Sequence, residues 1–256
     1  MALAPLAAAQ SGYQVVPVTN AGTIAGSVRW SGPKPAAATF PINKDEQVCD
    51  PNGQKTRDLE RLVLGPDGGV ANTVVYLKEI SSGKAFAFPD TRRALNQRHC
   101  RYEPHILLVP QKDALQMKSS DPVLHTVHMS GAATFNLPFP FVDRVVSHEM
   151  DYSGIADVRC NGGHAWMNAE LFVAPHPYYA VTDESGSFTL SDVPPGEYTL
   201  TAWHEGWTLS RSEYAVDVLT QQRIKRPVFS SPRTWDRKVT VTSGGTATVN
   251  FTLADK

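Results

Sequence analysis

Short stretches in which apolar and polar residues partly alternate recur along the whole chain. Residues 22–30, 71–77 and 198–203 are examples, and they are rich in β-branched and aromatic residues. Clusters of Gly, Pro, Asp and Ser bound these stretches, which is typical of strands joined by turns. Long helical periodicity is scarce, and the best candidate for a short helix is residues 91–97. The pattern therefore predicts an all-β fold made of β-sandwiches.

Composition narrows the class of protein further. The chain has 256 residues, a length that suits one or two domains. Its 24 Lys and Arg against 25 Asp and Glu give a net charge of −1. That balance argues against a nucleic-acid partner, because phosphate contacts need a basic excess. No run of about 18 apolar residues occurs, so we expect no transmembrane segment.

Two distant stretches look like halves of one module. Residues 182–188 carry the motif Thr-Asp-x-x-Gly-x-Phe, and residues 194–198 carry Pro-Pro-Gly-x-Tyr. Upstream, residues 26–35 hold a Gly-x-Val strand and a Gly-Pro turn, and residues 75–77 hold a Val-x-Leu strand. Together these motifs resemble the carboxypeptidase regulatory-like, transthyretin-like β-sandwich.

This resemblance implies a discontinuous β-sandwich formed by residues 22–83 and 175–256. Modules of this family are usually structural, so we assign this sandwich no chemistry. Residues 84–174 are then expected to form an inserted domain, which is physically ordinary when the ends of the insertion lie close together.

The inserted segment contains a candidate metal site. His125 is followed downstream by Cys160-x-x-x-His164-x-x-Met167. Two imidazoles, a thiolate and a weak axial thioether form the ligand set of a blue copper site, and the sulfur ligands favour copper by their softness. His128 is a second candidate. Because residues three apart on a strand point to opposite faces, we prefer His125 as the ligand and keep His128 as runner-up or supporting donor.

Residues 84–174 resemble the cupredoxins of the plastocyanin and amicyanin type. Leu124-His-Thr-Val127 approximates the stretch around the first histidine ligand of that family, and residues 154–160 look like the strand that delivers its cysteine. The loop here is Cys-x-x-x-His, one residue longer than the usual short loop, and it contains Gly162-Gly163. The resemblance implies a Greek-key sandwich, one copper ion and electron exit through an exposed edge of His164. The implied copper ligands are His125, Cys160, His164 and Met167.

The amino-terminal residues and the other cysteines bear on location. The Ala-rich start looks like the end of a secretory signal, so we expect residues 1–21 to be an export-signal remnant or a flexible terminus. The expected location is periplasmic or extracytoplasmic. If Cys160 binds copper, Cys49 and Cys100 remain, and export would allow them to form a disulfide. A reducing compartment would instead leave them as two buried thiols.

Basic and aromatic residues gather in a stretch that the transthyretin-like module does not explain, about residues 207–236. A decorated surface loop is one interpretation of it. The other is a docking arm, because Arg and aromatic residues are favoured in interfaces. The docking candidates are Arg223, Lys225, Arg226, Arg233 and Trp235.

The leading hypothesis is an extracytoplasmic type 1 copper protein that carries electrons to a redox protein, such as a cytochrome or a membrane electron-transfer complex. We expect no enzyme, since a single type 1 site offers no metal for a substrate and no hydrolase or P-loop motif occurs. The alternative is a metal-free accessory subunit of a respiratory or photosynthetic complex with a degenerate cupredoxin domain. Copper delivery, using the same ligands in a more open site, is a third option.

Overall fold

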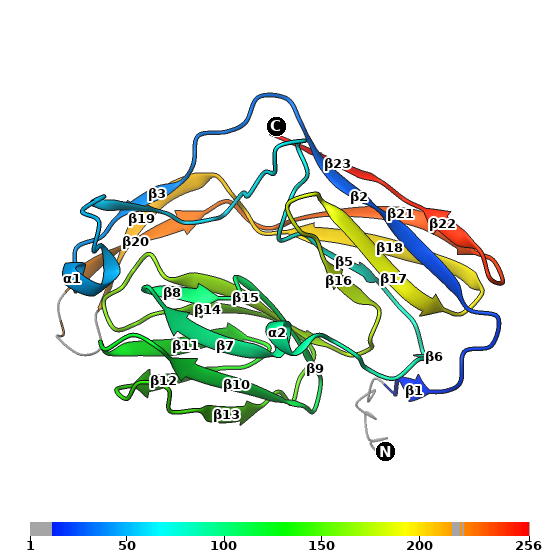
Figure 1. Ribbon diagram of the computed structural model, residues 1–256, viewed down its shortest axis with the longest axis horizontal. Coiled ribbons are helices and arrows are strands. Elements are labelled where there is room, and N and C mark those ends of the chain that lie inside the picture. Colours follow the sequence, from blue (N-terminus) through cyan, green and yellow to red (C-terminus); the bar gives the residue numbers. More distant parts are fainter. Residues whose placement is uncertain (1–11, 217–220, 222, 256) are drawn as a thin grey trace, which may run out of the picture.

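The computed structural model describes residues 12–216, 221 and 223–255, and these form two β-sandwiches lying side by side (Figure 1). The expected fold class, an all-β chain with one sandwich inserted in the other, is confirmed. Most of the predicted export-signal remnant, residues 1–11, lies outside the described residues. Among the described residues, none of the helices has the length and apolar character needed to cross a membrane.

The inserted sandwich packs two sheets around its own core. One sheet has the order β13 (Val146–Glu149), β10 (Ala114–Ser119), β7 (Ala94–Arg98), β8 (Arg101–Glu103). The other has the order β12 (Phe135–Phe139), β11 (His125–Gly131), β14 (Gly154–Arg159), β15 (Asn168–Ala174), β9 (Ile106–Pro110). Alternate residues of these strands face inward, as the two-residue period of a strand requires. The inward side chains include Leu95, Leu107, Leu115, Val127 and Leu171.

The second sandwich is built from both flanks of the insertion. One sheet has the order β16 (Tyr179–Val181), β5 (Val74–Leu77), β18 (Gly196–His204), β21 (Arg233–Val241). The other centres on β2 (Gly22–Ser31), which pairs with β17 (Ser187–Val193), β22 (Thr246–Thr248) and β23 (Phe251–Ala254). The turn before β17 needs glycine, because Gly186 has a φ of +74° and a Cβ there would lie 2.1 Å from the Val28 carbonyl oxygen.

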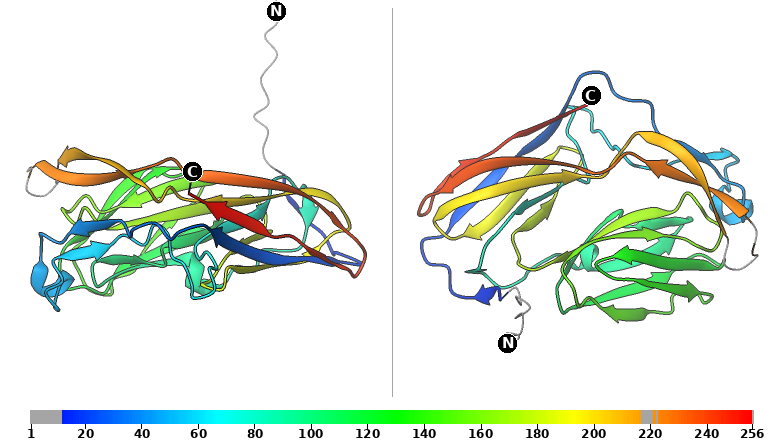
Figure 2. Two further views of the ribbon diagram at one scale, coloured as in Figure 1. Left: turned by 90° about the horizontal axis from the view of Figure 1, so that it is seen from above. Right: turned by 180° about the vertical axis from the view of Figure 1, so that it is seen from behind.

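Two excursions from the second sandwich reach the inserted one. The first contains β3 (Thr39–Pro41), the short helix α1 (Glu46–Cys49) and β4 (Thr56–Asp58). The second is a hairpin of β19 (Leu209–Val216) and β20 (Arg223–Phe229). Both lie over the same end of the inserted sandwich, as the front and rear views show (Figures 1 and 2). Phe40, Ile42, Cys49 and Leu59 accordingly contribute to its core.

The sandwiches touch through strands that are buried on both faces. Leu107 and Val109 of β9 face the inserted core, whereas Ile106 and Leu108 face the neighbouring sandwich. Val74 of β5 and Trp203 of β18 meet them from the other side. The remaining elements are β1 (Gln14–Val15), which pairs with β6 (Ser82–Gly83), and the short helix α2 (Asp90–Arg93).

The expected helix at residues 91–97 is wrong beyond its first turn. Only Asp90–Arg93 is helical, and Ala94–Arg98 forms β7. Leu95 and Gln97 are buried while Ala94 and Arg98 are exposed. This alternation suits a strand paired with β10 and β8, and the packing outweighs a weak local helix preference.

Candidate metal centre

Three predicted ligands meet where two neighbouring strands end. His125 begins β11, and Cys160 directly follows β14, the antiparallel partner of β11. His164 lies in the loop between β14 and β15. The side chains of His125 and His164 are 0% exposed, and Cys160 is 1% exposed. The sheet therefore delivers two of the donors on rigid strand ends and the loop delivers the third.

The donor atoms of these residues point at one another. The Nδ1 atoms of His125 and His164 are 3.2 Å apart, and Cys160 Sγ lies 3.7 Å from His164 Nδ1. One donor atom from each of the three residues lies within 4.8 Å of the others. Two imidazole nitrogens and a sulfur thus surround one small volume in the interior.

Carboxylates hold the far nitrogen of each ring. His125 Nε2 lies 3.0 Å from Asp121 Oδ2, and His164 Nε2 lies 2.9 Å from Asp45 Oδ2. An ionised carboxylate only accepts hydrogen bonds, so each ring donates its Nε2 proton. Such pairs leave the Nδ1 lone pairs facing inward, which is the arrangement that metal-binding histidines commonly show.

Local contacts also shift the pKa values in this group. Burial alone would raise the pKa of Cys160, but hydrogen bonds and charge interactions with His125 and His164 outweigh it and hold the pKa well below its usual range. Burial would lower the pKa of His125, yet its bonds to Asp121 and Cys160 raise that pKa to about 9. The two histidines therefore favour the thiolate form of Cys160, the form in which a cysteine binds a metal.

The loop after β14 is organised around the thiolate. The Gly162 N–H donates to Cys160 Sγ at 3.4 Å, and the Thr126 hydroxyl lies 3.8 Å from the same sulfur. Gly163 has a φ of +91°, a conformation that favours glycine. The two glycines thus have separate roles, since Gly162 donates to the sulfur and Gly163 adopts the positive φ.

The two remaining metal candidates occupy different places. Met167 is 2% exposed in the core of the inserted sandwich, and its N–H donates to the His164 carbonyl at 3.0 Å. His128 is half-buried, and its Nδ1 has no hydrogen-bond partner among the described residues. Among the described residues, the groups of donors close enough for a metal include His125 and leave out His128.

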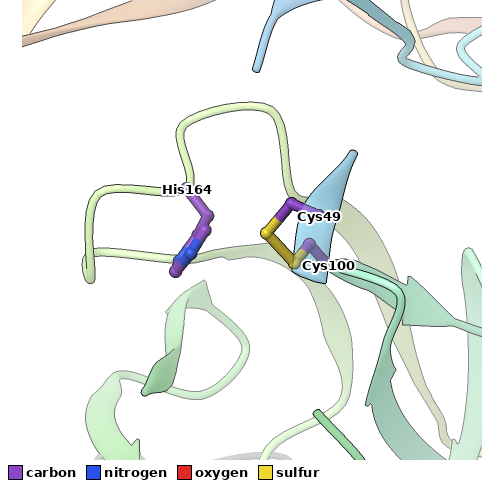
Figure 3. A group of neighbouring side chains, drawn as sticks. All are labelled: Cys49, Cys100 and His164. Carbon is purple, nitrogen blue, oxygen red and sulfur yellow. A yellow bond between two sulfur atoms is a disulfide. The ribbon is translucent and has the colours of Figure 1, made fainter. Parts of the chain in front are cut away.

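The expected exposed edge of His164 is wrong. Asp45, the residue before α1, covers the Nε2 side of the ring, and the side chain is fully buried. A disulfide between Cys49 and Cys100, the pair considered from the sequence, lies beside the same ring (Figure 3). The excursion that contains α1 therefore closes the end of the site that cupredoxin resemblance had left open.

Sequence reasoning missed both carboxylates. Asp121 had a usable signal, since it precedes His125 by four residues in a turn and also accepts the N–H groups of His99 and Cys100. Asp45 is 119 positions from His164, and nothing local to either residue links them.

The five docking candidates separate into three environments. Arg223 and Lys225 are exposed on β20, and Arg223 stacks over the Tyr214 ring at 4.4 Å. Arg226 is 7% exposed and donates to the Cys160 carbonyl at 3.1 Å. Arg233 and Trp235 lie on β21 of the second sandwich, where Arg233 covers Trp207 and Trp235 packs against the core. Only the first two face solvent on the hairpin.

A second buried polar cluster lies where the sandwiches meet. Glu205 is fully buried, with Arg61 2.5 Å from its Oε2 and His105 bonded to its Oε1. Burial would raise the pKa of Glu205, but the charges of His105 and Arg61 lower it. Nearby Glu170 has its pKa raised, first by burial and then by the Glu205 charge.

Comparison with known proteins finds two kinds of likeness. Residues 158–254 match the model of the carboxypeptidase regulatory-like domain. No curated protein matches the chain. The resemblance to the carboxypeptidase regulatory-like domain recurs in that match, and the solved structures similar to part of the chain include cupredoxins and a copper-containing nitrite reductase.

Three solved structures illustrate the second likeness. A purple cupredoxin from Nitrosopumilus maritimus is 17% identical, with 32% of this chain and 98% of that chain covered and a TM-score of 0.28. A reduced amicyanin variant is 20% identical, with coverages of 39% and 98% and a TM-score of 0.29. A copper-containing nitrite reductase from Thermus scotoductus is 12% identical, with coverages of 39% and 25% and a TM-score of 0.31.

Proposed function

We propose that this chain is an extracytoplasmic type 1 copper protein that carries electrons, rather than an enzyme. The observation that supports the proposal is the inward convergence of two imidazole Nδ1 atoms and one thiolate, with both outer nitrogens held by carboxylates. This donor set, soft sulfur with two imidazoles, suits copper. When bound, copper supplies the one-electron change between Cu(I) and Cu(II).

The proposed ligand residues assist this one-electron change because the fold holds them in fixed positions. His125 and Cys160 are set on paired strands, and His164 is held between Asp45 and the other donors. Met167 would supply the weak thioether ligand of a blue copper set. A ligand set that is held by buried hydrogen bonds changes little with oxidation state, which favours rapid electron exchange.

The route by which electrons leave differs from the one expected from the sequence. Since His164 is covered, the proposed route runs from the Cys160 carbonyl to Arg226, 3.1 Å away, and on to the exposed face of the β19–β20 hairpin. Arg223 and Lys225 on that face would receive an acidic surface of a redox protein such as a cytochrome.

Copper titration of the purified metal-free protein tests the proposal. We expect one Cu(II) per chain, with an intense visible band from thiolate-to-copper charge transfer. Replacement Cys160→Ser should abolish the band. A protein that takes up no copper would contradict the proposal and favour the metal-free accessory role, which co-purification with a membrane complex would then examine.

A matched pair of variants tests whether Met167 supplies the thioether ligand. Met167→Leu should change the reduction potential while the visible band persists, because the thioether tunes the potential rather than supplying the colour. Met117→Leu, a change at a methionine that is 1% exposed in the same core on β10, should leave the potential unchanged. Equal effects in both variants would remove Met167 from the ligand set.

A further inference from the structure

We propose that, before their disulfide forms, Cys49, Cys100 and His164 make a second metal site, which binds Cu(I) and passes it to the Cys160 centre. The inference rests on the proposed copper function and extends it to the way in which the ion is loaded. Its basis is the juxtaposition of a cysteine pair with a histidine that also belongs to the centre.

The donors form one continuous cluster. Donor atoms of Cys49, Cys100 and His164 lie within 4.8 Å of one another, and so do those of His125, Cys160 and His164. His164 is common to both groups, and the disulfide stands directly beside its ring (Figure 3). An ion held by the first group could therefore reach the second by exchange of ligands around one imidazole.

The described residues of the folded, disulfide-linked form bury the ligands of the centre, so a copper ion approaches it slowly. His125, Cys160, His164 and Met167 are each 2% exposed or less. The cover over His164 is a four-residue helix, α1, with Asp45 at its start and Cys49 at its end. The Cys49–Cys100 disulfide attaches this cover to the inserted sandwich. Copper should consequently enter faster while the cover is still unattached.

A newly made chain meets that condition, because its cysteines begin as thiols. The Cα atoms of Cys49 and Cys100 are 5.2 Å apart, so the dithiol form leaves two sulfurs next to the His164 ring. Two thiolates and one imidazole are soft donors of the kind that select Cu(I). Binding releases the two thiol protons, and copper stays Cu(I) throughout the transfer.

Closure follows once the ion has moved on. The two free thiols then react with a disulfide of a thiol oxidant protein by thiol–disulfide exchange. The Cys49–Cys100 bond forms, the oxidant disulfide is reduced to two thiols, and two electrons pass to the oxidant. The disulfide then removes the entry site and locks Asp45 against His164.

Removal of the final site isolates the entry site for measurement. The full-length Cys160→Ser chain, reduced with a phosphine and kept free of oxygen, is titrated with Cu(I) against a chromophoric Cu(I) chelator. We expect one Cu(I) per reduced chain and none that withstands the chelator after oxidation to the disulfide. The triple variant Cys49→Ser, Cys100→Ser, Cys160→Ser should bind Cu(I) more weakly by a factor of about 100 at least.

X-ray absorption and uptake kinetics complete the test. The Cu(I) form of reduced Cys160→Ser should show two sulfur neighbours. The reduced wild-type chain should load its centre faster than the disulfide form does. Equal Cu(I) binding by reduced Cys160→Ser and the triple variant would overturn the entry site, while a visible band in the copper-loaded wild type would leave the proposed function standing. Circular dichroism of each variant shows that it is folded.

Discussion

The described residues include two buried polar clusters whose side chains are arranged differently. In the junction cluster, the Glu205 carboxylate faces the Arg61 guanidinium and the His105 ring. In the candidate metal centre, the Nδ1 atoms of His125 and His164 face each other beside the Cys160 sulfur, so three atoms that can bind a metal meet. Burial of polar groups is favourable only when they find partners. Among the described residues, the first cluster pairs Glu205 with side chains of the chain itself, whereas the second would, on the proposed function, be completed by a bound copper ion.

The clusters also differ in where their charges are satisfied. The carboxylates of the metal centre, Asp45 and Asp121, bind the outer sides of the rings and leave the inner sides free. At the junction the carboxylate is itself at the centre. A carboxylate binds an Nε2 atom in both clusters, so the difference lies in the Nδ1 atoms of His125 and His164, which face each other beside the Cys160 sulfur.

The largest expected effect comes from breaking the junction cluster. Glu205→Gln leaves Arg61 buried without its counter-charge, and the loss should be about 3–5 kcal/mol of unfolding free energy. Urea unfolding of the metal-free protein measures it. Glu197→Gln, an exposed change on β18, the strand that Glu205 directly follows, is the control and should cost little. A loss as small as that of the control would show that the cluster is not a structural tie.

A buried histidine without any carboxylate extends the comparison. His176 is 3% exposed, its Nδ1 accepts the Tyr178 N–H, and its Nε2 has no hydrogen-bond partner among the described residues. Burial lowers its pKa from 6.5 to about 4. The unfolded chain therefore takes up a proton on His176 at a higher pH than the folded chain does. The free energy of unfolding consequently decreases as the pH falls from about 6.5 to 4.

The expected size of that loss is about 3 kcal/mol. It is measured as the free energy of unfolding at a series of pH values. His176→Gln keeps a side-chain acceptor and should flatten this part of the profile, whereas His148→Gln, at an exposed histidine, should leave it as in the wild type. An unchanged profile in the His176 variant would contradict the assignment.

Weakening the support of a metal ligand should have a smaller effect. Asp121→Asn removes the charge that orients His125, and copper affinity should fall about 10–100-fold. Competition with a chelator of known affinity gives the value. The matched control is Asp143→Asn, at an exposed aspartate bonded to Lys118, with no expected change in affinity. Identical affinities in the two variants would mean that the Asp121 carboxylate does not support a ligand.

The smallest effect is expected on the surface of the hairpin. The double change Arg223→Glu and Lys225→Glu should slow oxidation of the reduced copper form by an anionic oxidant several-fold at low salt, because steering depends on local charge. The difference should shrink as salt is added. Lys238→Glu, an exposed change on β21 of the other sandwich, should not alter the rate. If the oxidation rate depends only on the net charge of each variant, the hairpin is not the surface at which electrons are exchanged.

The features that could be predicted from the sequence are those determined by residues close together along the chain. Alternation along the strands and the spacing of Cys160, His164 and Met167 are local, so the fold class and the donor loop were visible. The five apolar residues of β9, Ile106–Pro110, also carried a signal, since an unbroken apolar run is typical of a strand buried on both faces. The apolar run of β9 thus indicates that a second layer covers this sheet.

The rest depends on tertiary packing. Asp45 and His164 are far apart in sequence, and so are Arg226 and Cys160, so no local pattern could link either pair. The helix expected over residues 91–97 failed for the same reason, because pairing with β10 decides the conformation of Ala94–Arg98. A site closed by a distant excursion is visible only once the strands are placed.

The strands with two buried faces have a thermal consequence. β15 begins directly after the donor loop and sends Leu171 into the inserted core and Phe172 toward the second sandwich. Heat that loosens one layer exposes the apolar face of the other, so the sandwiches should melt in a single calorimetric transition. A copper ion bound in one of them would then raise the melting temperature of the whole chain.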